Sequence, residues 1–484
     1  MRILVTGATS FVGRALCLRL ERDGHRVVAL VRDPERARTL LAAGVERLRL
    51  DPSAAGEESL AAEIDRCDAV LHLAGEPVIG KRWSAQQKRR LADSRVGLAR
   101  RLTAAMGRAA RGPRVFVSSS AVGLYGNRGD EVLREDSREG DDFLARLCLD
   151  WEAAAMEAAR SGARVVLLRT GIVLGPGGGV LGAMELPFRL GLGGRLGSGR
   201  QFVPWIHLDD LLEMFVRALD DPRLEGAFNA TAPEPVTNRD FTRALAEAVG
   251  RPAVFPVPGI ALRLLLGEAG AVLLAGQRAV PARFLAAGFR FAHPELGAAL
   301  RSLLGNGAPV RIEAARDVPD HPYLRSRPPT HALLATTRLD APLESVALFF
   351  SSAENLGSMT PSSMRFQIET PLPIAMARGT RIQYTIRLGP LPLSWLTVIE
   401  EWNGAEGFAD AQHRGPYRCW WHEHRFRRGE DPAGHTTLME DRVLFSAPLP
   451  GIGRLLVRWM IAPQLRRIFA YRARAMAWRF GVLP

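Results

Sequence analysis

The junction between the first apolar run and the first helical pattern restricts the fold more than any other part of the sequence. Residues 3–7, ILVTG, have the character of a buried strand, and residues 14–20, RALCLRL, have the spacing of a helix. Glycines between them allow a tight turn in which a pyrophosphate reaches the free N–H groups of the helix N-terminus. The sequence therefore predicts a dinucleotide-binding βαβ unit. The residues expected to line it are Gly7, Thr9, Ser10, Phe11, Val12 and Gly13.

Two positions in this unit bear on how the dinucleotide is bound. Ser10 replaces the middle glycine of such turns, and its side chain either crowds the cofactor or offers it a hydroxyl contact. The second strand ends at Arg32, where an acidic residue would bind the ribose of NAD and an arginine suits the 2′-phosphate of NADP. Arg32, with Arg36 within reach, therefore favours NADP(H) over NAD.

Other strand ends are expected to complete the cofactor crevice, because the carboxyl ends of parallel strands lie along one edge of a sheet. Asp51 follows the third strand and is a candidate contact to the adenine. The remaining expected lining residues are Leu73, Ala74 and Gly75 after the fourth strand and Ser118 in the fifth.

The chain is long enough, at 484 residues, for two domains with full cores. Residues 1–304 alternate β-branched runs with helical patterns, which predicts an α/β domain with a doubly wound, Rossmann-type parallel sheet. Residues 305–329 are polar and proline-rich without periodicity and are expected to be a linker. Residues 330–484 contain alternating strands before a helical stretch, which predicts a separate α+β domain. Expected elements of the first domain are strands at 3–7, 26–32, 69–75, 114–120 and 164–175 and helices at 84–106 and 143–161.

The composition, with 47% hydrophobic and 24% charged residues, is that of a soluble globular protein. Four separated cysteines without a CxxC pair indicate neither zinc nor disulfides. No apolar run suits a signal peptide or a transmembrane span, so a cytoplasmic location is expected. The formal net charge of +13 comes from basic residues interleaved with acidic ones, which favours a solvated surface over nucleic-acid binding. The exception is the range 442–484, with eight arginines and no acidic residue.

Several motifs follow one another through residues 1–304: TGATSFVG, DAVLHLAGEP, VFVSSSAVGLYG, LRTGIVLGPGGG and WIHLDD. In this order they resemble the short-chain dehydrogenase/reductase superfamily, in its extended, nucleotide-sugar-epimerase-like branch. The resemblance implies an NADP-dependent oxidoreductase or epimerase-like enzyme with a small-molecule substrate. Active members use Asn, Ser, Tyr and Lys, and the corresponding positions here are Arg95, Ser120, Leu144 and Cys148.

The usual Tyr-x-x-x-Lys pair is absent from this domain, because residues 1–304 contain one tyrosine, Tyr125, and two lysines, Lys81 and Lys88. Tyr125 is one candidate proton donor. Lys88 and Arg95 are a second candidate, since residues seven apart on a helix share a face and a cation there could stabilise an oxyanion. The alternatives are that Tyr125 packs beneath the site and that Lys88 is solvated. The missing pair also permits a non-catalytic NADPH-binding redox or ligand sensor.

Three other features invite a chemical role. Cys148 is expected to be a small core residue rather than a nucleophile. In the run His207-Leu208-Asp209-Asp210, the aspartates are expected chiefly to cap the following helix. The glycine-rich loop at 191–201 either binds an anionic substrate or is a mobile surface loop.

The second domain contains PLESVALFFSSAENLGSMTP, MARGTRIQYTIRLG, GPYRCWWHEHRF and MEDRVLF. These segments resemble the START-like, helix-grip (SRPBCC) superfamily, which implies a cavity for a hydrophobic ligand. Strand alternation places Trp420, His422 and His424 on one face, with Trp421 opposite. Two such histidines could bind a metal, but no third ligand is visible, so no metal is predicted. The apolar stripe of the last helix is expected to face the cavity rather than a membrane surface.

Overall fold

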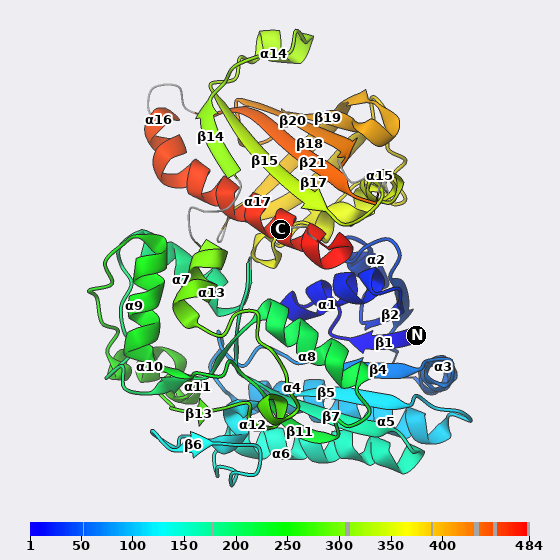
Figure 1. Ribbon diagram of the computed structural model, residues 1–484, viewed down its shortest axis with the longest axis vertical. Coiled ribbons are helices and arrows are strands. Elements are labelled where there is room, and N and C mark those ends of the chain that lie inside the picture. Colours follow the sequence, from blue (N-terminus) through cyan, green and yellow to red (C-terminus); the bar gives the residue numbers. More distant parts are fainter. Residues whose placement is uncertain are drawn as a thin grey trace.

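The computed structural model describes residues 1–51, 53–176, 178–304, 310–388, 391–429, 435–448 and 453–481. The first residues of the expected linker, 305–309, and the last residues of the expected second domain, 482–484, lie outside the described residues. Two sheets organise the chain, one parallel and one antiparallel, and Figure 1 shows them one above the other.

The first sheet has seven strands, all parallel, in the order β11-β7-β5-β4-β1-β2-β3. The order changes direction between β1 and β4, and ligands of such sheets bind in the crevice at that point, outside the carboxyl ends of the strands. The predicted Rossmann-type sheet is therefore confirmed. The strands are β1 (Arg2–Thr6), β2 (Arg26–Val31), β3 (Glu46–Arg49), β4 (Ala69–His72), β5 (Val115–Ala121), β7 (Arg164–Thr170) and β11 (Gly226–Ala230).

Helices cover both faces of this sheet, which explains why its strands are almost continuously apolar. Leu16 and Leu211 pack in the core on one face, and Leu60 and Leu102 pack in the core on the other. The elements are α1 (Phe11–Arg22), α2 (Pro34–Arg38), α3 (Ala54–Asp65), α4 (Ala85–Ala92), η1 (Asp93–Gly97), α5 (Leu98–Arg108), η2 (Val122–Tyr125), α6 (Phe143–Met156), η3 (Glu157–Ser161) and α8 (Leu208–Asp220).

The segment 164–175, expected as one strand, is two strands separated by Gly171. A Cβ at Gly171 would lie 2.4 Å from the carbonyl oxygen of Pro204, so the chain turns away where another backbone approaches. After this turn β8 (Ile172–Leu174) leaves the large sheet and pairs with β10 (Trp205–His207). The break directs the following chain over the crevice.

A smaller group of helices and two-stranded ladders stands beside the crevice. Its core joins α7, α9 and α13 through residues such as Phe188, Phe241 and Leu300. The elements are β6 (Val132–Leu133) with β13 (Arg278–Ala279), β9 (Phe202–Val203) with β12 (Val236–Thr237), α7 (Gly179–Arg189), α9 (Asn238–Val249), α10 (Gly259–Leu266), α11 (Glu268–Val272), α12 (Ala282–Ala286) and α13 (Leu296–Leu304).

The second sheet has eight antiparallel strands in the order β14-β15-β21-β20-β19-β18-β17-β16. Part of the expected linker belongs to it, because β14 pairs with β15. The strands are β14 (Val310–Ala314), β15 (His331–Leu339), β16 (Gln367–Ile368), β17 (Arg381–Leu388), β18 (Leu391–Trp402), β19 (Gly407–Arg414), β20 (Cys419–Arg428) and β21 (Thr437–Ser446). The helical elements are α14 (Pro322–Ser326), α15 (Leu343–Phe350), η4 (Ala353–Gly357), η5 (Ser362–Met364), η6 (Gly404–Glu406), α16 (Gly453–Leu456), η7 (Val457–Ile461) and α17 (Ala462–Phe480).

Helix α17 lies between the two parts of the molecule (Figure 1). The apolar stripe that includes Leu465, Phe469 and Met476 is buried, as expected. Along its other side α17 packs on α1, and Arg14 of α1 donates to the carbonyl oxygens of Gly357 and Thr360 at 3.0 and 3.1 Å. Apolar residues of both parts form one continuous core cluster.

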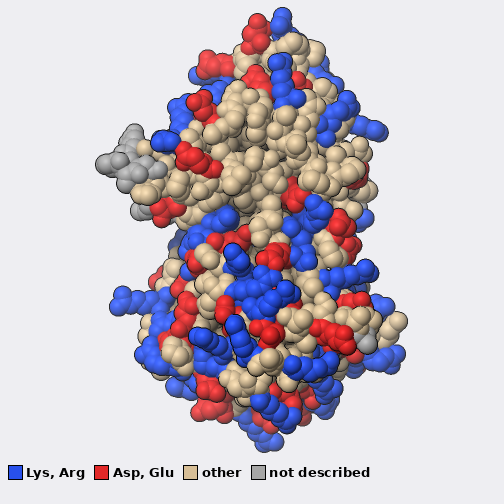
Figure 2. Space-filling model, turned by 90° about the vertical axis from the view of Figure 1, so that its right-hand side faces the viewer, with Lys and Arg blue, Asp and Glu red and all other residues tan. Residues whose placement is uncertain are grey.

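The surface carries mixed charge. On the face shown in Figure 2, basic and acidic side chains alternate over the parallel-sheet part, while the antiparallel part shows a broader uncharged area. Among the described helices, none has both the length and the hydropathy to cross a membrane.

The two parts touch backbone to backbone at Gly357, which gives a test of their docking. A Cβ at Gly357 would lie 1.5 Å from the carbonyl oxygen of Thr39. We expect Gly357→Ala to weaken docking by about 1–3 kcal/mol, the usual cost of overpacking. Faster limited proteolysis between the two parts would report this loss. The control is Gly107→Ala in α5, where nothing lies within 4 Å of the added Cβ; equal proteolysis of the two variants would contradict the prediction.

Candidate active site

The turn between β1 and α1 has the geometry that a pyrophosphate requires. Gly7 has a φ of +71°, and a Cβ at Gly13 would lie 2.2 Å from the carbonyl oxygen of Gly7. Ser10 is the N-cap of α1, and its hydroxyl oxygen accepts the Gly13 N–H at 3.0 Å. The serine thus stabilises the turn, and its exposed hydroxyl can still donate a hydrogen bond to a ligand.

The other residues of the turn face the later part of the domain. Thr9 and Val12 are half-buried. The ring of Phe11 lies against Gly175 and Gly179, so that a Cβ at Gly175 would lie 2.8 Å from its tip. Phe11 therefore packs on the loop after β8 and fixes the rim of the crevice.

Arg32 and Arg36 lie exposed beyond the carboxyl end of β2. Asp33, between them, caps α2 by accepting the backbone N–H of Arg36 at 3.0 Å. This hydrogen bond involves neither guanidinium group. Within the part of the chain that the structure describes, neither guanidinium forms an ion pair or a hydrogen bond. Arg32 acts on Glu76 through space and helps to lower its pKa, and the two exposed cations can bind a dianionic phosphate.

Asp51, expected near the adenine, lies in the loop after β3. Its carboxylate accepts the Ser53 N–H at 2.9 Å, and this hydrogen bond holds the pKa of Asp51 below its usual range. Arg101 donates to the carbonyl oxygen of Asp51 at 2.6 Å and pairs with Glu57. The structure thus gives Asp51 a role in bracing this loop.

The loop after β4 contacts the dinucleotide turn directly. A Cβ at Gly7 would lie 2.8 Å from the backbone nitrogen of Ala74, and the Ala74 N–H donates to the Thr6 hydroxyl at 3.2 Å. Leu73 N–H donates to the carbonyl oxygen of Thr6. A Cβ at Gly75 would lie 2.9 Å from the guanidinium carbon of Arg95, so the Arg95 side chain packs directly against this loop.

His72, at the end of β4, was not singled out from the sequence. Its Nδ1 lies 2.8 Å from the Thr6 hydroxyl and its Nε2 lies 3.3 Å from the carbonyl oxygen of Arg95. Burial lowers the pKa of His72 to about 4, so the ring is neutral near pH 7. The sequence signal for His72 is a polar residue in the otherwise apolar strand β4.

The serines of β5 bond within the protein. Ser118 is fully buried, and its hydroxyl donates to the carbonyl oxygen of Ser119 at 3.0 Å. Ser120 is buried too and donates to Glu152 of α6 at 2.6 Å. The hydroxyl of Ser120 is therefore held by a carboxylate, away from free solution.

Tyr125 lies in a buried polar network beneath the site. Its hydroxyl donates to Asn229 Oδ1 at 2.7 Å and accepts from Arg169 at 3.0 Å. Arg169 also forms a two-pronged ion pair with Glu152, with both bonds at 2.9 Å. Burial raises the pKa of Tyr125, which keeps the phenol protonated. The contacts agree with the packing alternative for Tyr125.

Lys88 and Arg95 have different partners. Lys88 pairs with Glu268 at 2.6 Å and lies over the ring of Phe143. Arg95 lies in η1, a π-helical turn that interrupts the helix expected at 84–106, and donates to the carbonyl oxygen of Glu76 at 2.9 Å. Its guanidinium lies over the ring of Trp151 and against Gly75 of the crevice loop.

The Tyr and Lys positions implied by the family resemblance hold side chains without acid–base chemistry. Leu144 packs near Gly123, and Cys148 is buried one turn later on α6. Burial raises the pKa of Cys148 to about 12, so it stays a thiol. Its expected role as a core residue is confirmed.

The run 207–210 differs from the expected cap. His207 is the N-cap of α8, and its Nδ1 accepts the Asp209 N–H at 3.1 Å. Asp210 instead accepts the N–H groups of Ala292 and His293. Both aspartates therefore lie after the cap position, because the His207 imidazole already accepts the Asp209 N–H.

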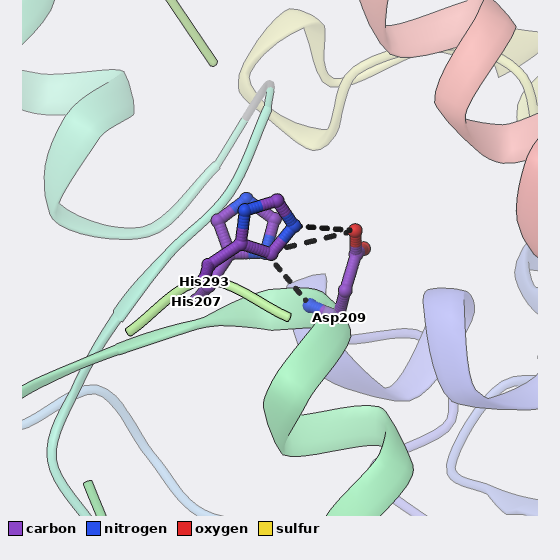
Figure 3. A group of neighbouring side chains, drawn as sticks. All are labelled: His207, Asp209 and His293. Carbon is purple, nitrogen blue, oxygen red and sulfur yellow. Dashed lines mark hydrogen bonds and ion pairs between the residues drawn. The ribbon is translucent and has the colours of Figure 1, made fainter. Parts of the chain in front are cut away.

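Figure 3 shows how His207, Asp209 and His293 converge. The two ring centroids lie 3.7 Å apart with the rings tilted by 30°, and His293 Nε2 lies 3.4 Å from Asp209. Helix α17 reaches the same carboxylate, with Arg474 at 3.1 Å and the Trp478 indole N–H at 2.9 Å. Burial alone would raise the pKa of Asp209, but His293 and Arg474 together hold it below its usual range. Asp209 thus ties α17 to the crevice rim.

The glycine-rich loop at 191–201 is braced from within. Arg195 donates to the carbonyl oxygens of Gly197 and Ser198, at 3.0 and 2.8 Å. These bonds order the loop and occupy part of the Arg195 guanidinium, which leaves less of it for an anionic substrate.

The antiparallel part holds an apolar cavity of about 180 Å³ between its sheet and α17. Trp395, Trp420, His422 and His424 line it, together with Arg472 of α17. Trp421 packs on the opposite face of the sheet with Tyr323, as strand alternation predicts.

Comparisons with known proteins bear on residues 1–304. Residues 3–230 match the model of the NAD dependent epimerase/dehydratase family, and residues 257–303 match a domain of unknown function, DUF1731. Epimerase family protein Mb2239 of Mycobacterium bovis is 43% identical over 292 residues, which cover 60% of this chain and 93% of that protein. Human epimerase family protein SDR39U1 is 39% identical over 300 residues, covering 61% and 97%. The crystal structure of human SDR39U1 (isoform 2) with NADPH superposes with a TM-score of 0.57 at 38% identity, covering 63% of this chain and 99% of that one.

The network around Tyr125 predicts a structural role that a substitution can separate from catalysis. We expect Tyr125→Phe to lower the free energy of unfolding by about 1–3 kcal/mol, because Arg169 and Asn229 lose a buried partner. Nucleotide affinity should stay unchanged, since the hydroxyl bonds Asn229 and Arg169 and neither belongs to the dinucleotide turn or to the loop after β4. Urea unfolding and a nucleotide titration check the two parts. Unchanged stability with lost turnover would instead make Tyr125 a catalytic residue.

Proposed function

Because the chain belongs to the NAD dependent epimerase/dehydratase family, we propose that it binds NADP(H) in the crevice of its parallel sheet and acts on a small molecule as an epimerase-like oxidoreductase. The single observation that carries the cofactor choice is the free pair Arg32 and Arg36 at the end of β2. The crystal structure of the human relative with NADPH supports the same choice.

The residues of the crevice fit such a cofactor. Gly7 and Gly13 bring the backbone of the turn close to the start of α1, where free N–H groups attract a pyrophosphate. Arg32 and Arg36 would hold the 2′-phosphate. When bound, NADP(H) supplies or takes up the hydride.

Arg95 is the residue of this chain that we assign to charge stabilisation. Its guanidinium lies against Gly75, over the ring of Trp151, and at the family's Asn position. Burial lowers its pKa, but an arginine stays protonated near pH 7. A fixed cation here would stabilise an oxyanion that develops on a substrate carbonyl. Ser120 and Tyr125 belong instead to the buried network of Glu152 and Arg169.

One observation favours a second candidate function. The single tyrosine of residues 1–304 is buried, and α17 ties the crevice rim to the second domain. A protein that binds NADPH without turnover and reports it through α17 would have these features. This sensor is the alternative to an enzyme.

For the second domain we propose a START-like role in holding a hydrophobic small molecule. The apolar cavity beside α17 supports this role, because its walls combine aromatic rings with few polar groups. Fusion to the nucleotide domain keeps such a ligand at high effective concentration near the crevice.

The cofactor proposal predicts the effect of a charge reversal. Arg32→Glu should weaken NADPH binding about 10- to 100-fold, since each charge-assisted hydrogen bond contributes about 1.5–3 kcal/mol, while NADH binding should change little. Fluorescence titration with both nucleotides measures this selectivity. Arg26→Glu, the same change at the opposite end of β2, is the control. NADPH affinity that is equal in the two variants would refute the role of Arg32.

Native mass spectrometry tests both binding proposals in one experiment. Gently purified chain with added NADPH should carry one nucleotide mass, and a second, apolar organic mass should accompany part of the population. The bare polypeptide mass at saturating NADPH would contradict the nucleotide proposal. A nucleotide adduct without any organic mass, even after incubation with a cell lipid extract, would contradict the ligand proposal.

A further inference from the structure

Three neighbouring strands bring four ionisable side chains together in the second domain, and three of them, Asp410, His422 and His424, line its cavity. Asp410 of β19 stands opposite His422 of β20, and His424 stands opposite Asp441 of β21. All four are buried, and the ring centroids of His422 and His424 lie 3.7 Å apart, with the rings tilted by 41°. Phe408 covers the other side of His424 at 4.1 Å, so the rings are held rigidly.

Asp410 supplies the third ligand that was not visible in the sequence. Its Oδ2 lies 3.2 Å from His424 Nε2 and 3.9 Å from His422 Nδ1. One ligand atom from each of Asp410, His422 and His424 can be chosen so that all lie within 4.8 Å of one another. These separations suit ligands that each bind a common ion at about 2.0–2.2 Å.

Asp441 lies behind the histidines, where a metal site has its supporting carboxylate. His422 Nε2 lies 3.0 Å from Asp441 Oδ1, so this N–H donates to the carboxylate and leaves Nδ1 free to face Asp410. His424 Nδ1 lies 2.9 Å from both Asp441 Oδ1 and Arg472 Nη2. With Nε2 bound to a metal, the Nδ1–H donates to Asp441 Oδ1. Arg472 Nη2, which can only donate, must then move away from Nδ1, and its ion pair with Asp441 Oδ2 can remain.

The charges of this group also suit a cation. Arg472 lies 3.1 Å from Asp441 Oδ2 and neutralises that carboxylate. Among the described residues, Asp410 has no lysine or arginine partner, so its carboxylate is the one in this group that a metal ion could bind.

The similar group at His207, Asp209 and His293 (Figure 3) has the opposite arrangement. There Arg474 and Trp478 bind the carboxylate that a metal would need, at 3.1 and 2.9 Å. The Arg474 guanidinium therefore already pairs with the carboxylate that would have to bind a metal ion.

From this geometry we propose that Asp410, His422 and His424 bind a first-row divalent transition metal in the cavity of the second domain. Two imidazoles and one carboxylate form a donor set for ions such as Zn²⁺, Co²⁺ or Fe²⁺. Three protein ligands leave a coordination position open toward the cavity. An apolar ligand with one oxygen donor, such as a carbonyl or hydroxyl group, fits that position. The site does not depend on nucleotide binding.

Cobalt is a suitable probe because its visible absorption reports coordination. The full chain, treated with a chelator and titrated with Co²⁺, should bind one equivalent and develop the intense bands of a four- or five-coordinate site. Asp410→Ala and His424→Ala should each weaken binding at least about 100-fold. Asp441→Asn should weaken it about 10- to 100-fold, as expected of a supporting carboxylate.

Two controls separate this site from other histidines. His293→Ala removes a ligand of the similar group, and His413→Ala removes a half-exposed histidine of β19 that bonds Glu400. Both variants should bind Co²⁺ like the unmodified chain. If His293→Ala abolishes binding while His424→Ala does not, the proposal is wrong. If a cavity variant fails to fold, the titration of the unmodified chain still tests the proposal. Detecting only weak absorption bands of hexaaqua Co²⁺ throughout that titration would overturn the proposal.

Discussion

The packing of α1 on α17 is the contact on which the rest of this molecule depends. Arg14 is buried in it and donates to Gly357, Thr360 and the hydroxyl of Tyr471. A buried guanidinium needs several acceptors to offset its lost hydration, and here they come from the other domain. The N-terminus of the same helix α1 forms the proposed pyrophosphate site, and α17 lines the cavity. One contact therefore joins both proposed binding sites.

The parallel-sheet domain could be predicted closely from the sequence because its signals are local. A strand, a glycine turn and a helix lie within 20 residues, and buried parallel strands are apolar throughout. The break at Gly171 could not be predicted in this way. It depends on the backbone of Pro204, which reaches Gly171 only in the folded chain.

The polar residues of the candidate sites could likewise be predicted only where their positions depend on local sequence. The phosphate turn and Arg32 follow from position in the chain, whereas the place of Tyr125 depends on Arg169 and Asn229, 44 and 104 residues away. Asp410 was missed as a partner of His422 for the same reason: strand pairing, not spacing, brings them together. The π turn that contains Arg95, whose side chain packs against Gly75, also lacks a sequence signal.

The contact between Arg14 and Tyr471 joins residues 457 positions apart, so it cannot form on the ribosome until both α1 and α17 have been synthesised. Until α17 is made, the outward face of α1 has no cover, although the parallel sheet beneath it is already complete. Domains of a growing chain generally fold in order from the N-terminus, and uncovered apolar surface is where chaperones and misassembly act. Docking of the second domain is thus also the step that ends the vulnerable period of the first.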